Sequence, residues 1–230
     1  MLFNKIFATA LILFFAFISE SYAQHSSAEV RKVREATEVM REIYSIPETA
    51  IPPTLLANAH AVVVLPKLVK AGFIVGGRYG TGLMMVRDMQ GNWHYPVMVS
   101  LTGGSVGFQI GAQSTDIILV FKSMKSVDAI QKGKFTLGGD ASVAAGPVGR
   151  HVEAGTDIKL ESEIYSYSRS RGLFAGIALE GAALQIDHDS TWALYSLSAY
   201  DILNRTEFSK LPAEVEEFYK VMAAYIRNSK

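Results

Sequence analysis

Cysteine is absent from the 230-residue sequence. Its absence excludes disulfides, thiolate nucleophiles, zinc–thiolate sites and acylation of an amino-terminal cysteine. An excess of charge of either sign is also missing, since 22 Lys and Arg balance 22 Asp and Glu. No global field therefore draws the protein toward nucleic acid or anionic lipid, and no nucleic-acid partner is expected. Any attraction to anions must come from local patches of charge.

Hydrophobic residues make up 49% of the chain and charged residues only 19%, the composition of a packed globule. The first residues have the pattern of an export signal: Lys5 is followed by the apolar run 6–18 and the small-x-small site Ser21–Ala23. This run is shorter than the roughly 20 residues that span a bilayer. We expect cleavage of residues 1–23, a single domain over 24–230, and a periplasmic, outer-envelope or secreted location.

The stretch from Ala71 to Phe121 is the expected centre of the fold. Short β-branched and aromatic runs alternate there with glycines, each of which would cost a helix about 1 kcal/mol. Such runs predict consecutive antiparallel strands, and glycines within them mark sharp bends or close approaches of the backbone. The sequence predicts an α+β fold: a curved antiparallel β-barrel or sandwich, with its β core over about 60–187, flanked by N-terminal and C-terminal helices. The later strands of this core are expected at 135–137, 141–145, 152–154, 158–168 and 173–186.

Helices are predicted at about 26–45 and about 189–228, the last beginning at Pro212. In the first, apolar positions recur at three and four residues, the period of an amphipathic helix; they are Val30, Val33, Thr37, Met40 and Tyr44. Two interpretations remain open: the apolar face packs on the domain, or it inserts into a membrane surface. Lys67, Lys70 and Arg78 are either solvated charges at turns or an anion-binding patch.

Motifs for catalysis and metal binding are weak. Gly103-x-Ser105-x-Gly107 matches the nucleophile elbow of serine hydrolases, but the following residues are predicted to continue a strand, whereas the elbow needs a helix. Asp187-His188-Asp189 offers metal ligands, although a turn with Asp189 as helix cap is the simpler interpretation. We expect no cofactor, no metal and no enzymatic activity.

Several motifs together resemble the SYLF domain, a lipid-binding family of bacteria and eukaryotes. They are Leu65-Pro66-x-x-x-Lys70-Ala71-Gly72-Phe73, Gly76-Gly77-x-x-Gly80-x-Gly82, Trp93-x-x-Pro96, Gly103-Gly104-Ser105-x-Gly107-x-Gln109-x-Gly111-Ala112-Gln113, Asp140-Ala141-Ser142-Val143-Ala144-Ala145-Gly146-Pro147, and Tyr165-Ser166-Tyr167-Ser168-x-Ser170-x-Gly172-Leu173-Phe174-Ala175-Gly176. They occur in the family's order, and the similarity covers the chain from about Ala28 to its end.

The resemblance implies binding. Eukaryotic members bind phosphoinositide membranes, some also bind actin, and bacterial relatives are exported to the envelope. Lipid contact in the family is attributed to an amino-terminal amphipathic helix and basic residues. On this chain these are Arg31, Lys32, Arg34 and Arg41, with Lys67, Lys70 and Arg78 as a second patch. An exported bacterial protein meets neither phosphoinositides nor actin, so anionic envelope phospholipid is the expected ligand. The alternative is a periplasmic scaffold or assembly protein that binds a protein partner.

Overall fold

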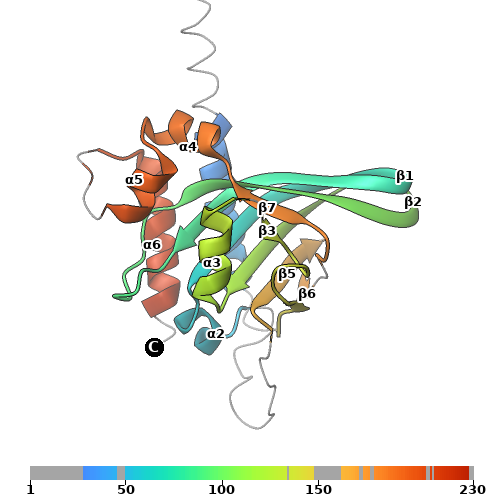
Figure 1. Cartoon of the computed structure of the whole chain (residues 1–230), viewed down its shortest axis with the longest axis horizontal. Coiled ribbons are helices and arrows are strands. Elements are labelled where there is room, and N and C mark those ends of the chain that lie inside the picture. The colour runs from blue at the N-terminus through green and yellow to red at the C-terminus, as the bar shows by residue number, and fades with distance from the viewer. Residues whose placement is uncertain are drawn as a thin grey trace, which may run out of the picture.

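The computed structural model describes residues 28–45, 50–133, 135–147, 162–170, 173–176, 179–205, 208 and 210–227, with the backbone alone at 72–75, 105–112, 170 and 173–176. The predicted export signal lies outside these residues. After an N-terminal helix over 28–45, the elements are α2 (Pro53–Ala57), β1 (Ala61–Val86), β2 (Val97–Phe121), α3 (Met124–Gln131), β3 (Phe135–Thr136), β4 (Val143–Ala145), β5 (Ile164–Ser170), β6 (Leu173–Gly176), β7 (Ala183–Ile186), α4 (His188–Tyr195), α5 (Ala199–Asn204) and α6 (Ala213–Arg227) (Figure 1).

The described strands form one seven-stranded sheet organised around β1 and β2. These two strands pair antiparallel almost end to end, from Ala61 opposite Phe121 to Met84 opposite Val97. The other edge of β2 takes β7 along its first part and β5 along its last part. The α+β prediction is confirmed. The predicted curvature and flanking helices are confirmed as well: the sheet curls into a half-barrel, which does not close into a complete barrel.

The β1–β2 ribbon folds back on itself, and glycines make the close approach possible. Arg87 N–H, just after β1, donates to the carbonyl of His60, just before it, over 2.8 Å. A Cβ atom at Gly82 would lie 2.0 Å from the carbonyl oxygen of Val64, and one at Gly80 would lie 3.0 Å from Leu68 Cδ1. No side chain fits at Gly82, so glycine is required there for steric reasons.

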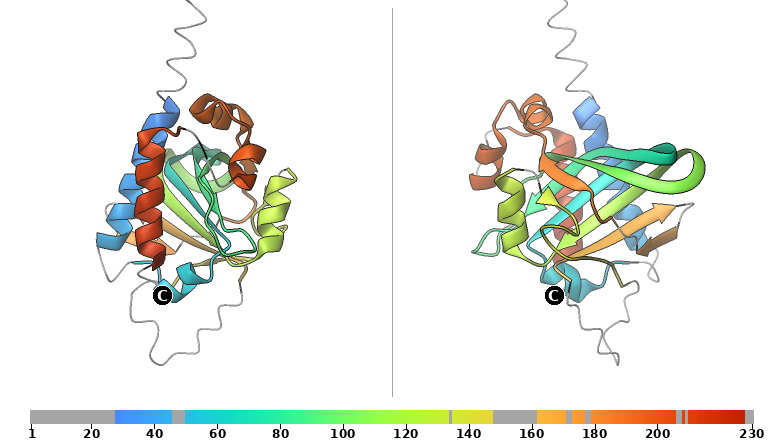
Figure 2. Two further views of the ribbon diagram at one scale, coloured as in Figure 1. Left: turned by 90° about the vertical axis from the view of Figure 1, so that its left-hand side faces the viewer. Right: turned by 45° about the vertical axis from the view of Figure 1, so that its right-hand side comes forward.

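The apolar run Ala61–Leu65 is buried on both faces of the sheet, as its composition predicts. Successive side chains alternate between faces. Val62 and Val64 therefore join a core that also contains residues of the N-terminal helix and α6, whereas Val63 joins a second core that contains residues of α3 and α5. In Figure 2 the N-terminal helix and α6 lie side by side against the sheet.

Some predicted elements differ from those observed. The expected strand over 173–186 is two strands, β6 and β7, and the strand expected over 141–145 begins only at Val143. A third expected strand, over 152–154, lies outside the described residues. Asp187, two residues before the predicted cap Asp189, is the N-cap of α4: its carboxylate accepts from the amide of Ser190 over 3.0 Å. The prediction chose the wrong member of the Asp-His-Asp triplet.

Candidate functional site

The apolar face of the N-terminal helix packs against the body of the domain. Its central side chains are at most 3% exposed: Val33, Ala36, Val39, Met40 and Ile43. The packing interpretation therefore holds in this structure. Val30 and Tyr44, predicted for this face, lie at its margin and are only half-buried; the ring of Tyr44 stacks on Tyr225 of α6 with centroids 3.6 Å apart. Ala36, Val39 and Ile43 were missed, although they recur at the same three- and four-residue spacing.

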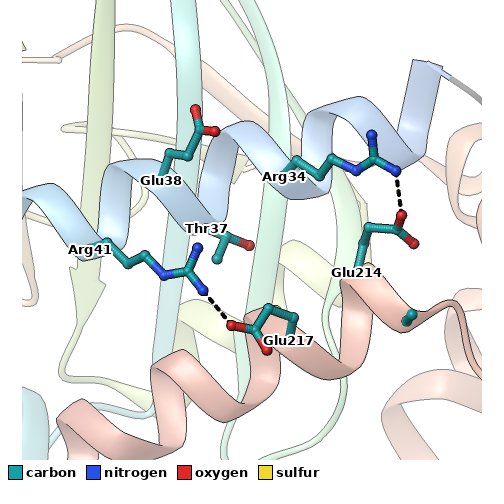
Figure 3. A pocket seen from close by; sticks show the side chains of 7 residues that line it. Arg34, Thr37, Glu38, Arg41, Glu214 and Glu217 are labelled. Carbon is teal, nitrogen blue, oxygen red and sulfur yellow. Dashed lines mark hydrogen bonds and ion pairs between the residues drawn. The ribbon is translucent and has the colours of Figure 1, made fainter.

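Two arginines of the N-terminal helix, predicted to bind lipid, pair with carboxylates of α6. Arg34 Nη2 lies 2.5 Å from Glu214 Oε1, and Arg41 contacts Glu217 (Figure 3). The hydrogen bond from Arg34 holds the pKa of Glu214 below its usual value. Both pairs cross an open hollow of about 480 Å³ between the two helices, which is also lined by Thr37, Glu38 and Ala213. Each of these arginines therefore has a carboxylate of α6 as its partner.

Lys32 and Lys67 converge on a third carboxylate, that of Glu35. Their Nζ atoms lie 3.1 Å and 2.7 Å from its oxygens. Burial alone would raise the pKa of Glu35, but the hydrogen bonds from the two lysines outweigh burial, so this pKa lies below its usual value. The hydrogen bond to Glu35 in turn raises the pKa of Lys67. Lys67 therefore fastens the helix to β1, a role that the sequence did not indicate.

The backbone at Lys67 bulges out of β1 and is held by Asp116 of β2. Lys67 has a left-handed φ of 53°, and its amide donates to Asp116 Oδ1 over 2.9 Å. The other oxygen of Asp116 lies 2.7 Å from Arg169 Nη2 of β5, and Arg169 also contacts Glu42 of the helix. Asp116 is the single acidic residue of the two ribbon strands, the one sequence signal that could have singled it out. The network joins the helix to three strands.

Lys70 and Arg78 remain apart from these ion pairs. Both lie in β1, opposite Gln113 and Gly103 of β2. Arg78 donates from Nε and Nη2 to the carbonyl of Gly104, over 3.2 Å and 3.0 Å, and Lys70 is exposed. Among the described residues, no carboxylate pairs with either cation. Arg31 is also exposed, but it lies on the N-terminal helix, far in sequence from Lys70 and Arg78.

The motif considered for catalysis lies in a strand, and the motif considered for metal binding lies at the start of a helix. Residues 103–107 are interior to the continuous strand β2, so the backbone around Ser105 has no strand-to-helix elbow. Within the described parts of the chain, no group of three or more His, Asp or Glu side chains is arranged to hold a metal ion. None of the helices described there combines the length and the apolar character needed to cross a membrane.

Truncation of Met40 tests the docking of the helix. Met40 is fully buried in the core between the helix, the sheet and α6. Met40→Ala is expected to lower the free energy of unfolding by about 2–5 kcal/mol, because it removes buried apolar surface and leaves a cavity. Arg31→Ala, on the exposed face, is the control and should change it by less than about 0.5 kcal/mol. Urea denaturation measures both; equal midpoints would mean that the helix is not docked in solution.

The fold and this site define a class: a small α+β domain built around a folded-back basic ribbon, with its N-terminal helix fastened by ion pairs. Comparison with known proteins identifies a family. The family model Ysc84, described as "Las17-binding protein actin regulator", matches residues 102–225. The chain belongs to this family, the Ysc84 or SYLF family, which confirms the resemblance found in the sequence.

Curated relatives include SH3 domain-containing YSC84-like protein 1 of Xenopus laevis, 35% identical over 201 residues, which are 84% of this chain and 59% of that protein. An SH3 domain-containing protein of Schizosaccharomyces pombe is 38% identical over 186 residues, 79% of this chain and 43% of the relative. Protein YSC84 of Saccharomyces cerevisiae is 36% identical over 140 residues, 60% of this chain and 30% of the relative. The chain thus spans less than two thirds of each of these relatives.

Proposed function

We propose that this protein binds anionic phospholipid at a membrane surface and has no enzymatic activity. The observation that carries the proposal is the charge of the β1–β2 ribbon. Strands β1 and β2 together contain three Lys or Arg and a single acidic residue, Asp116, within a chain of zero net charge. A local excess of cations on an elongated element suits an extended anionic surface, to which each Lys or Arg contributes about 1 kcal/mol of binding.

The proposed location is the bacterial envelope. The apolar run 6–18 and the site at Ser21–Ala23 support export of the chain. An exported protein would meet the anionic headgroups of envelope phospholipid. The hydrolase alternative has less support, because Ser105 lies within a continuous strand.

A second candidate function is a scaffold or assembly protein that binds a protein partner. It is favoured by the description of the matching family as Las17-binding and actin-regulating. In the envelope the partner would be another protein, captured by crosslinking in envelope extract. Efficient crosslinking to one protein in a strain with unchanged lipid composition, together with failure to bind vesicles, would favour this function.

Vesicle flotation tests the lipid proposal. The purified protein is mixed with vesicles of phosphatidylglycerol and phosphatidylethanolamine, or with phosphatidylcholine vesicles as the neutral control. We expect flotation with the anionic vesicles only, and its loss as the salt rises from 50 mM to 500 mM, because salt screens exposed charges. Equal recovery with both vesicles, or recovery with neither at low salt, would contradict the proposal.

A further inference from the structure

We propose that the membrane-facing surface is the folded-back end of the β1–β2 ribbon, formed by Val69, Lys70, Arg78 and Tyr79, and that the N-terminal helix stays docked during binding. This inference rests on the proposed function and names its binding surface. Figure 1 shows the ribbon extending away from α5 and α6. We call these four residues the ribbon surface.

The fold-back brings the two cations of this surface to the same face of the ribbon. Gly80 lies against Leu68: a Cβ atom added at Gly80 would lie 3.0–3.2 Å from three atoms of Leu68. Side chains two residues apart in a strand share a face. Lys70 therefore follows Leu68, and Arg78 precedes Gly80, on the same side of this contact and toward the bend. The two cations therefore share the inner face of the folded-back ribbon, and by the same alternation Val69 and Tyr79 lie on its outer faces.

Exposed apolar surface accompanies these cations. Tyr79 is 57% exposed and Val69 is 45% exposed, two of only a few large apolar side chains of the described residues with such exposure. Tyrosine has an apolar ring and a polar hydroxyl, which suits the boundary between headgroups and acyl chains. The end of the ribbon thus combines cations on its inner face with exposed apolar side chains on its outer faces, which complements an anionic phospholipid surface in both charge and polarity.

The N-terminal helix is poorly placed to bind membrane in the same way. Val33, Met40 and Ile43 are fully buried, and each contributes at least about tenfold to the docking equilibrium. Loss of these three contacts alone would therefore make the released state of the helix about a thousandfold less populated than the docked state. Four ion pairs also join this helix to α6, β1 and β5. Its paired cations would have to leave their carboxylates before they could bind lipid phosphates.

Removal of the two ribbon cations tests the surface. Lys70→Gln/Arg78→Gln is compared with Lys125→Gln/Lys132→Gln, which removes the same charge from exposed positions of α3 and its C-cap. We expect the ribbon variant to bind the anionic vesicles about 25-fold more weakly, at about fivefold for each cation. The α3 variant should stay within twofold of the wild type. Circular dichroism verifies that both variants are folded.

A crosslink tests whether the helix stays docked. Because the chain has no cysteine, Arg41→Cys/Glu217→Cys can be bridged specifically by a short bismaleimide, which fastens the helix to α6. We expect the bridged protein to bind vesicles within twofold of the unbridged one. Loss of binding upon bridging would show that release of the helix is required and would overturn the inference.

The outcomes separate the two proposals. If the wild type does not bind anionic vesicles, the proposed function fails. If the wild type binds and Lys70→Gln/Arg78→Gln binds equally well, the function stands and the ribbon surface is wrong. Equal losses in the ribbon and α3 variants would also reject the ribbon surface, since binding would then depend on total charge.

Discussion

Replacement of Gly82 by alanine is expected to prevent stable folding of the β1–β2 ribbon. The added Cβ would lie 2.0 Å from the carbonyl oxygen of Val64 and 2.8 Å from Leu65 Cα. Both are backbone atoms in the paired part of β1, so neither can turn away as a side chain could. The two halves of the ribbon would have to separate. We expect a loss of at least about 4 kcal/mol, a large part of the 5–15 kcal/mol that stabilises a typical domain.

A glycine elsewhere in the same ribbon provides the matched control. A Cβ at Gly104 would meet no atom within 4 Å, and Gly104 is exposed in β2. Gly104→Ala should therefore change the free energy of unfolding by less than about 0.5 kcal/mol. Urea denaturation followed by tryptophan fluorescence and circular dichroism compares the two variants. Equal midpoints for Gly82→Ala and Gly104→Ala would show that the fold-back is not closely packed.

Gly146→Ala is expected to have the second largest effect. Its Cβ would lie 2.2–2.6 Å from three atoms of the Tyr167 ring. This ring is fully buried, and its hydroxyl donates to the carbonyl of Pro147 over 3.0 Å. The ring therefore has no free space into which to move. Overpacking in cores costs about 1–3 kcal/mol, and we expect the upper end of this range in thermal or urea denaturation.

A double-mutant cycle separates this clash from other effects of the substitution. In the Tyr167→Leu background the ring is absent, so Gly146→Ala should cost much less than in the wild type. The interaction free energy should be 1 kcal/mol or more, since residues in direct contact couple in the range of about 0.5–3 kcal/mol. Additive effects of the two substitutions would mean that the contact between Gly146 and Tyr167 does not limit the packing.

The sequence predicted that the ribbon bends, because the glycines that permit the bend lie within the bending strands themselves. Glycines spaced among β-branched residues indicate a sheet that bends closely on itself, and Gly80 and Gly82 lie at such a contact. The apolar run Ala61–Leu65 likewise predicted a strand buried on both faces, because a continuous apolar run is the composition of such a strand. Closure of the sheet was not predictable, because it depends on which edges meet in space.

The predicted site was only partly informative, since the sequence does not show which charges pair. Arg34 and Arg41 have the same chemistry as Arg78, yet the first two face carboxylates of α6 and the third faces a backbone carbonyl. Lys67 was grouped with Lys70 from proximity in sequence, but the bulge at Lys67 directs its amide to Asp116 and its ammonium to Glu35. Pairing is a property of the tertiary structure.

The ion pairs between the N-terminal helix and α6 also constrain the order of folding. Arg34 and Glu214 are 180 residues apart in the chain, and Arg41 and Glu217 are 176 apart. A chain that emerges from its amino end, from a ribosome or through a translocation pore, makes the helix long before its binding site is complete. Its apolar face has no α6 to pack against until residues 213–227 emerge. During that interval a chaperone has a defined segment to shield, and final assembly of the domain awaits α6.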